Sequence, residues 1–285
     1  MSEILVTGGS GQLAQALAAL APGLRVVGRP HFDFERPETI AAVLEAARPA
    51  LVINAAAYTA VDRAESEPEQ AARANASGPG LIARWCAAQG VPLVHVSTDY
   101  VFDGRQGAPY AEDAQPNPTG VYGRTKRDGE IAVLESGARA AILRTSWVYA
   151  PRGKNFVLTM LQAGRTRPAL RVVADQIGCP TAAADLAAAA LVVGRRLIAD
   201  KQAATGIFHA AGSGFTSWHG LAVAALERAG IQTPVEPIAT ADWPTPAQRP
   251  ADSRLSCERL ATLYGVRLPD WRESLHRVVD DFLAA

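Results

Sequence analysis

Cysteine is scarce in this chain, and its few copies are scattered. Among 285 residues only Cys86, Cys179 and Cys257 occur, and no pair of them has CxxC spacing. An odd, sparse set of cysteines indicates a reducing compartment and supports neither a disulfide framework nor a structural zinc site. A cytoplasmic protein is therefore expected.

The sequence also lacks an excess of charge of either sign and lacks long apolar runs. Lys+Arg and Asp+Glu both number 28, so the formal net charge is zero. This balance argues against nucleic-acid or anionic-membrane partners, although it leaves room for a local phosphate pocket. No apolar run reaches about 18 residues, so no transmembrane helix is expected. Residues 1–6 are predicted to form a strand, and not a signal peptide.

What the first half does contain is a regular alternation of short apolar runs with helical patterns. The apolar runs, each predicted to be a buried strand, lie at 4–7, 25–27, 50–53, 92–97 and 140–144. Helical periodicity follows at 13–20, 37–47, 68–89 and from residue 122 onward. This alternation is typical of an α/β fold with a Rossmann-type, doubly wound parallel sheet.

Beyond residue 150 prolines and loops become frequent, above all at 234–250. Further helices are expected at 183–199, 217–229, 256–264 and 270–284, and one more strand at 207–210. We therefore predict a dinucleotide-binding Rossmann domain over 1–150, with return segments near 183–210. Residues 151–285 are expected to form a smaller, interleaved substrate-binding lobe.

A glycine-rich turn, Thr7–Ala14, follows the first strand and opens a helix. Gly8 and Gly11 allow a tight turn and a close approach of the backbone to a ligand, and the helix N-terminus then faces a pyrophosphate. Strand, turn and helix together favour dinucleotide binding. After the second strand the chain has Arg29, and the nearest carboxylate, Asp33, comes later. An arginine there suits the 2′-phosphate of NADP(H).

Two hydroxyl groups, Ser97 and Thr98, stand at the end of the fourth strand, where open α/β sheets bind ligands. A hydroxyl there could donate to a substrate carbonyl oxygen and stabilise the charge that develops on it. His95, within the same strand, is interpreted as a packed core histidine and not as a catalyst.

Tyr122 precedes Lys126 by four residues, so a helix places both side chains on one face. A nearby ammonium is expected to lower the phenol pKa and make the tyrosine a usable proton donor. Such a pair also arises by chance, and its interpretation depends on the phosphate-binding turn and the hydroxyls before it.

In this order the motifs resemble the extended short-chain dehydrogenase/reductases, and among them the dTDP-4-dehydrorhamnose reductase family. The resemblance covers nearly the whole chain. The blocks that carry it are Asn54–Asp62, Ser97–Gly104, Tyr122–Lys126, Leu143–Tyr149, Asp175–Thr181 and Arg249–Leu255.

The resemblance implies roles for the matching residues. Thr98, or else Ser97, would hydrogen-bond the C4 keto oxygen of a sugar, and Tyr122 would protonate that oxygen as hydride arrives. Lys126 would hold the nicotinamide ribose and depress the tyrosine pKa. The residues implied at the cofactor are Gly8, Gly11, Gln12, Leu13, Arg29, Asp33, Phe34, Ala55, Ala56, Tyr58, Ser97, Tyr122 and Lys126. Those implied at the sugar nucleotide are Thr98, Asp99, Val101, Phe102, Tyr122, Trp147, Asn155, Gln176, Pro180, Thr181 and Arg249.

The implied reaction is the NADPH-dependent reduction of dTDP-4-dehydro-L-rhamnose to dTDP-L-rhamnose, with NADH as a tolerated cofactor. Two alternatives stay open at this point. One is reduction of a related nucleotide 4-keto-6-deoxy sugar, for example to a 6-deoxytalose. The other is a non-catalytic subunit like the regulatory subunit of methionine adenosyltransferase, but the presence of Thr98, Tyr122 and Lys126 together favours catalysis.

The chain departs from the family at the metal. Some of these reductases hold magnesium at a dimer interface through glutamates, where this sequence has Ala16 and the segment Ala182–Asp185. Hard divalent cations need several oxygen ligands, so no magnesium is predicted. Asp185 is interpreted as a charge at a helix N-terminus. A monomer or a weak homodimer is expected.

Overall fold

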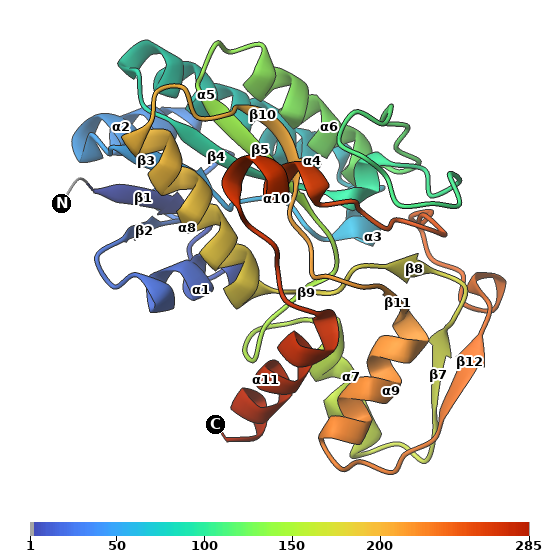
Figure 1. The fold of residues 1–285 in the computed structure, drawn as a ribbon. Helices are drawn as coiled ribbons and strands as arrows, with labels where there is room; N and C mark the ends of the chain where they lie inside the picture. The colour runs from blue at the N-terminus through green and yellow to red at the C-terminus, as the bar shows by residue number, and fades with distance from the viewer. Residues whose placement is uncertain (1–2, 285) are drawn as a thin grey trace.

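Six short strands pair in parallel to form the central sheet (Figure 1). The computed structural model, which describes residues 3–284, orders the strands β10-β5-β4-β3-β1-β2. Their bounds are β1 Ile4–Thr7, β2 Arg25–Val27, β3 Leu51–Asn54, β4 Leu93–Thr98, β5 Ala140–Thr145 and β10 Gly206–His209. Most of these residues are buried on both faces, which explains why the strands read as continuous apolar runs. The predicted doubly wound fold is confirmed.

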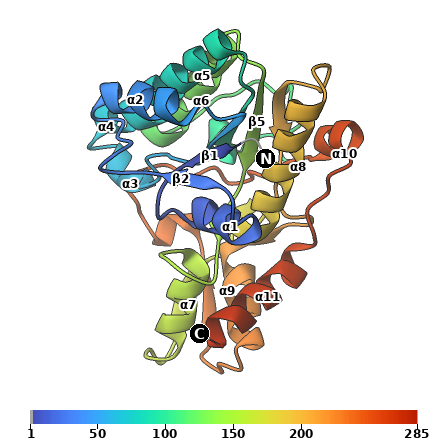
Figure 2. The ribbon, with the colours of Figure 1, turned by 90° about the vertical axis from the view of Figure 1, so that its left-hand side faces the viewer.

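Helices cover both faces of the sheet (Figure 2). On one face α1 (Gln12–Leu20) packs on α8 (Ala183–Ala199), with α10 (Glu258–Tyr264) beside β10. The other face is covered by α2 (Pro37–Ala47), α5 (Gly78–Gln89) and α6 (Val121–Leu134). Each layer buries one apolar stripe against the strands, so the central parallel strands are enclosed.

The segment predicted as one helix over 68–89 is divided in the structure. It consists of α4 (Pro68–Ala72), a π-helical turn over Arg73–Ser77 and α5. The wider turn directs the buried amide of Asn75 towards Tyr58, whose backbone N–H it accepts at 2.8 Å, and towards Thr125, to which it donates at 3.1 Å. A short helix, α3 (Val61–Ala64), precedes this segment, and a 3-10 turn over Asp99–Val101 follows β4.

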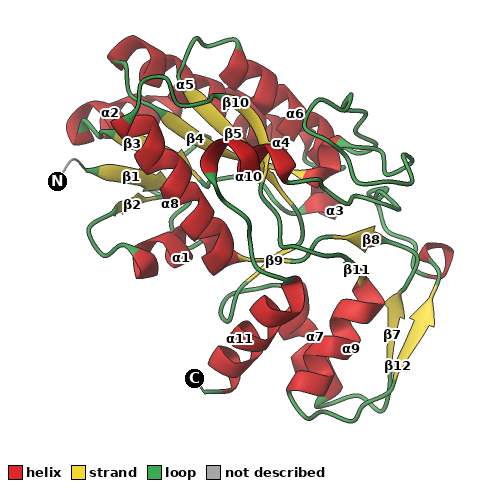
Figure 3. Cartoon of the chain, in the orientation of Figure 1, coloured by secondary structure: helices red, strands yellow, loops and turns green. Residues whose placement is uncertain are grey.

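A smaller lobe lies below the sheet in Figure 1, around a second apolar core. Three helices enclose this core: α7 (Phe156–Gly164), α9 (Trp218–Arg228) and α11 (Trp271–Leu283). Its short strands pair two by two, and Figure 3 shows how loops separate them. The pairs are β6 (Val148–Tyr149) with β9 (Thr181–Ala182), β7 (Leu170–Val173) with β12 (Val235–Ile238), and β8 (Ile177–Gly178) with β11 (Thr216–Ser217).

The proline-rich segment 234–250 contains more structure than the sequence predicts. β12 pairs in parallel with β7 despite Pro237, and a 3-10 turn follows at Thr240–Asp242. A two-stranded ribbon leaves one edge of each strand unpaired, which is where a proline is tolerated. No helix of residues 3–284 is long and apolar enough to cross a membrane.

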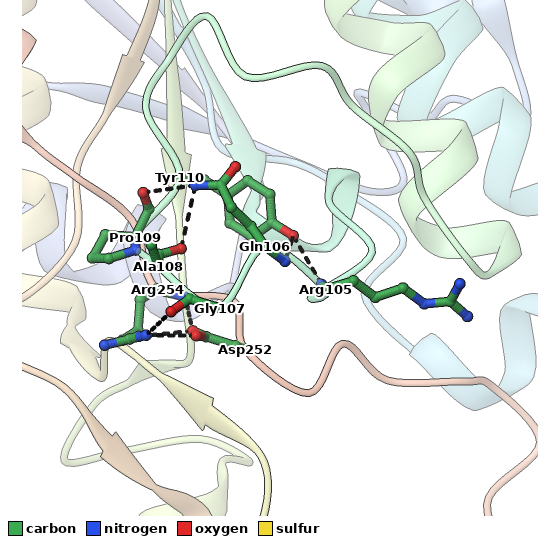
Figure 4. A network of polar contacts seen from close by, with 8 residues as sticks. All are labelled: Arg105, Gln106, Gly107, Ala108, Pro109, Tyr110, Asp252 and Arg254. Atoms are coloured by element: carbon green, nitrogen blue, oxygen red, sulfur yellow. Dashed lines mark hydrogen bonds and ion pairs between the residues drawn. The ribbon is translucent and has the colours of Figure 1, made fainter.

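The loop after β4 is tied to a segment near the C-terminus (Figure 4). Tyr110 donates its backbone N–H to the Arg254 carbonyl at 2.8 Å, and the Arg254 guanidinium reaches the Gly107 carbonyl at 3.2 Å. Asp252 pairs with Arg254 at 2.6 Å. Gly104 has φ of 75° and leaves no room for a Cβ, which would meet the Ala251 nitrogen at 2.5 Å. Hydrogen bonds and close backbone packing therefore hold the two segments together.

Candidate active site

A cleft of about 780 Å³ opens at the carboxyl ends of β1, β3, β4 and β5. The strand order reverses between β1 and β3, and α/β sheets bind ligands at such a reversal. The residues implied at cofactor or sugar that line it are Gly8, Gly11, Gln12, Leu13, Arg29, Asp33, Phe34, Ala55, Ala56, Tyr58, Ser97, Thr98, Asp99, Tyr122, Lys126, Trp147 and Asn155.

The glycine-rich turn forms one end of the cleft. Gly8 has φ of 113°, and a Cβ there would lie 3.1 Å from the carbonyl of Ala55. Gly11 caps α1 without a side-chain hydrogen bond, so the first N–H groups of the helix are free to bind an anion. The turn therefore fits the pyrophosphate of a dinucleotide. Glycine lets the backbone approach the phosphates closely, and the N-terminus of α1 favours negative charge.

A buried chain of hydrogen bonds supports the strand ends behind this turn. Thr7 donates to Asn54 at 2.6 Å, and Asn54 donates to Nδ1 of His95 at 3.0 Å. His95 is fully buried, as predicted for a core histidine, and burial places its pKa well below the ordinary value. It is therefore a neutral, structural group.

Arg29 lies exposed at the far rim of the cleft, near Asp33 and Phe34. Among the ion pairs of residues 3–284, none involves Arg29, whereas Asp33 lies 3.7 Å from Arg36. The Arg29 guanidinium is thus available to an anionic group of a ligand.

The other end of the cleft holds Tyr122 and Lys126, from the first turns of α6. Glu65 accepts the backbone N–H of Val121 at 2.7 Å and fixes the start of this helix. Gly123 lets the helix approach the end of β4, since a Cβ there would lie 2.2 Å from the Tyr100 carbonyl oxygen. Tyr122 and Lys126 therefore line the same cleft as Thr98.

The expected lowering of the Tyr122 pKa by Lys126 is wrong for this structure. Removal from water raises the pKa of Tyr122 to about 12, although the neighbouring Thr98 hydroxyl opposes the rise. The Lys126 ammonium instead donates to the Val96 carbonyl at 2.7 Å, and burial lowers its pKa to about 8. Tyr122 is therefore protonated near neutrality, which is the form that a proton donor needs.

The two hydroxyls at the end of β4 face different partners. Ser97 lines the cleft, but its hydroxyl donates to Glu130 at 2.5 Å, and Glu130 in turn pairs with Arg144 at 2.7 Å. Thr98 points the other way and donates to Asp99 at 3.0 Å. Of the two, only the Thr98 hydroxyl lies beside Tyr122.

Trp147 and Asn155 line the side of the cleft that belongs to the smaller lobe. Trp147 has φ of 48° and stacks on Trp218, which also lines the cleft. Asn155 caps α7 by accepting the backbone N–H of Leu158, and it donates to Gln12 at 3.0 Å. The lobe is thus hydrogen-bonded to the glycine-rich turn.

Six residues implied at the sugar nucleotide do not line the cleft. Val101 and Phe102 are fully buried, and Pro180 and Thr181 are also buried, because the segments that carry them pack into the core. Gln176 stands one layer back, where it accepts the indole N–H of Trp218 at 3.1 Å.

Arg249 is the sixth. It forms an ion pair with Asp62 at 2.8 Å and holds the 240–250 loop against α3. The guanidinium is therefore occupied by a neighbouring carboxylate where the sequence led us to expect contact with the sugar nucleotide.

Trp218 and Lys154 are among the cleft residues that sequence reasoning missed. Trp218 begins α9, far along the chain from its stacking partner, and no local pattern connects them. Lys154 lies in the loop directly before Asn155, exposed and close to the glycine-rich turn. Its position next to a predicted binding residue was the available signal.

Comparison with known proteins gives a consistent result. The family model described as the RmlD substrate binding domain matches residues 1–284. The dTDP-4-dehydrorhamnose reductase of Sinorhizobium fredii is 46% identical over 285 residues, covering 97% of this chain and 96% of the relative.

Solved structures agree with this. The dTDP-4-dehydrorhamnose reductase of Clostridium acetobutylicum superposes with a TM-score of 0.91 at 35% identity, covering 99% of this chain and 100% of its own. The dTDP-4-dehydrorhamnose reductase of Bacillus anthracis, solved in complex with NADP, gives a TM-score of 0.91 at 33% identity. The match covers 100% of this chain and 99% of the Bacillus anthracis chain.

Proposed function

The chain belongs to the dTDP-4-dehydrorhamnose reductase family, and from that premise we propose that it reduces the C4 keto group of dTDP-4-dehydro-L-rhamnose with NADPH, giving dTDP-L-rhamnose. One observation carries the proposal: Thr98, Tyr122 and Lys126 meet in the same cleft as the glycine-rich turn. Because all three are in place, catalysis is favoured over a role as a non-catalytic binding subunit.

The residues of the cleft fit NADP(H). The open N-terminus of α1 and the glycine at position 8 would receive the pyrophosphate. Arg29 would bind the 2′-phosphate, with NADH tolerated at a cost in affinity. When bound, the nicotinamide supplies the hydride that the reaction needs.

The proton comes from the protein. As the C4 carbon gains hydride, its bond to oxygen becomes single and the oxygen takes the phenolic proton of Tyr122. Thr98 would stabilise the developing charge on the same oxygen. Lys126 would hold the nicotinamide ribose, and its positive charge would stabilise the phenolate left on Tyr122.

The smaller lobe would bind the sugar nucleotide. In this proposal residues 1–150, with the return segments near 183–210, hold NADP(H), and residues 151–285 supply the lobe around the dTDP-sugar. Trp147 and Asn155 stand where the two meet. A monomer or weak homodimer in the cytoplasm completes the proposal, consistent with three unpaired cysteines.

We also propose that activity needs no magnesium. Asp185, in the first turn of α8, accepts hydrogen bonds from Ser274 and Arg277 of α11, the latter at 2.7 Å. Its oxygens are thus used to join two helices, and Ala16 offers none. EDTA should leave the rate and the oligomeric state unchanged, and a large effect would contradict this point.

The experiment mixes purified protein with NADPH and dTDP-4-dehydro-L-rhamnose and follows the absorbance of NADPH. The wild type should consume NADPH, whereas Tyr122→Phe should lower kcat by at least about a hundredfold, since the proton donor is lost. The dissociation constant for NADPH should be nearly unchanged in the variant. Absence of turnover by the wild type on authentic substrate would refute the proposal.

A further inference from the structure

The carboxyl group of Asp99 is buried beside the reacting groups. Only 1% of Asp99 is exposed, and the residue directly follows Thr98. Its Oδ1 accepts the Thr98 hydroxyl at 3.0 Å and its Oδ2 accepts Ser146 at 3.1 Å, while Ser253 donates a further hydrogen bond. None of the ion pairs within residues 3–284 includes Asp99. It is a buried acid whose side-chain partners are hydroxyl groups.

This arrangement fixes the direction of the Thr98 hydroxyl. A hydroxyl has one proton and two lone pairs. Thr98 accepts the backbone N–H of Tyr100 at 3.2 Å and gives its only proton to Asp99. While Asp99 is ionised, Thr98 therefore has no proton to donate to a substrate oxygen.

Protonation of Asp99 reverses the direction of this hydrogen bond. A neutral carboxyl can donate its own proton to Thr98, which then accepts two hydrogen bonds and has its hydroxyl proton free. That proton can reach the oxygen which Tyr122 protonates, since both side chains line the same cleft.

We propose that Asp99 is a positioning residue whose protonation turns the Thr98 hydroxyl towards the C4 oxygen of the substrate. The inference rests on the proposed function and deepens it. Two forms of the enzyme then differ in activity. With Asp99 neutral, the C4 oxygen receives hydrogen bonds from both Tyr122 and Thr98, and with Asp99 ionised, from Tyr122 alone.

The titratable groups that face Asp99 do not change charge in the pH range where Asp99 does. Tyr100, Tyr122 and Cys179 face it, and burial raises the pKa of each, that of Tyr122 and of Cys179 to about 12. Arg249 and Asp62 lie behind Tyr100 as a pair of opposite charges. Burial raises the pKa of Asp99 to about 6, despite the three hydroxyls that favour its charged form.

The test is the pH profile of kcat for the wild type and for Asp99→Asn. An asparagine can donate its amide N–H to Thr98 and accept from Ser146 and Ser253, so it imitates the neutral acid. Wild-type kcat should fall by roughly five- to tenfold as pH rises from about 5.5 to 7.5, because the C4 oxygen loses the hydrogen bond from Thr98 and the free energy that one hydrogen bond contributes. The profile of Asp99→Asn should be flat over this range, and both should share any further change caused by Lys126 near pH 8.

Two further variants separate positioning from a merely structural role. Ser146→Ala removes one donor to the charged acid without touching Thr98, so the fall in kcat should move to higher pH. In Thr98→Val the fall should be absent, and adding Asp99→Asn should change the profile no further.

The outcomes are distinct. If the wild type does not reduce the ketosugar, the proposed function fails. If it does, but Asp99→Asn keeps the wild-type pH dependence or loses activity equally at every pH, the role of Asp99 is refuted. Thermal unfolding of each variant at the assay pH shows whether the variant is folded.

Discussion

The indole ring of Trp147 stacks on that of Trp218, with 3.6 Å between the ring centroids and 8° between the planes. Trp147 has φ of 48°, a left-handed conformation that is unfavourable for a large side chain. Trp218 is held in turn by its N–H bond to Gln176 at 3.1 Å. The stack therefore keeps Trp147 at the cleft against an unfavourable backbone conformation.

Replacing Trp218 with alanine should weaken substrate binding more than it slows the chemical step. Without its stacking partner Trp147 is free to leave the cleft, so KM for the sugar nucleotide should rise about tenfold, in line with the value of an aromatic pair. KM for NADPH should change little. Steady-state kinetics measures both, and Trp218→Phe, which preserves part of the stack, should be milder.

Trp85→Phe is the matched control, because Trp85 donates its indole N–H to Glu45 of α2 at 2.6 Å and does not line the cleft. It should leave both KM values as they are. Near-ultraviolet circular dichroism reports the loss of the stacked indole pair in Trp218→Ala. If that signal is lost while KM for the sugar nucleotide is unchanged, the stack does not support substrate binding.

Arg29→Ala should change the choice of cofactor. Loss of a charged hydrogen bond to the 2′-phosphate should raise KM for NADPH roughly 10- to 100-fold. KM for NADH, which has no such phosphate, should stay nearly constant. Arg25→Ala is the control, since Arg25 lies at the start of β2 and its nearest carboxylate is Glu3 at 3.8 Å. Equal losses with both cofactors would contradict the assignment.

The ion pair between Glu130 and Arg144 connects α6 with β5 and is almost fully buried, with side-chain exposures of 3% and 1%. Removing one partner leaves the other charge buried and uncompensated. Arg144→Met should therefore destabilise the protein by about 3–5 kcal/mol. Urea unfolding followed by circular dichroism measures this change.

The double variant Glu130→Leu with Arg144→Met should be less destabilised than Arg144→Met alone, because no buried charge remains. Additive losses in the double variant would show that the two charges do not compensate each other. Since Glu130 also raises the pKa of the buried Lys126, Glu130→Gln should lower that pKa further.

Local periodicity made much of the fold predictable. The helix expected at 37–47 is observed as Pro37–Ala47, and that expected at 183–199 as Ala183–Ala199. The six sheet strands lie within one or two residues of their predicted bounds, because buried parallel strands are short apolar runs. The helix α7 and the ribbon of β7 and β12 were not predicted, although their residues are largely apolar, and they pack on a core that segments distant in the sequence assemble.

The site was predictable where residues are close in sequence and less so where distant segments meet. Spacing placed Tyr122 and Lys126 on one helix face, but it could not reveal that Val96 accepts the ammonium and that burial dominates the phenol pKa. Similarly, no pattern in the sequence brings Trp218 to Trp147, or Asp62 to Arg249.

The most direct test of the account is the structure of the sugar product made with NADPH that carries deuterium at the transferable position. NMR of the product should show dTDP-L-rhamnose with deuterium on C4 and a new hydroxyl on the same carbon. This result requires delivery of the hydride from the nicotinamide to C4. A product with the opposite configuration at C4, or one without deuterium there, would contradict the proposed reaction.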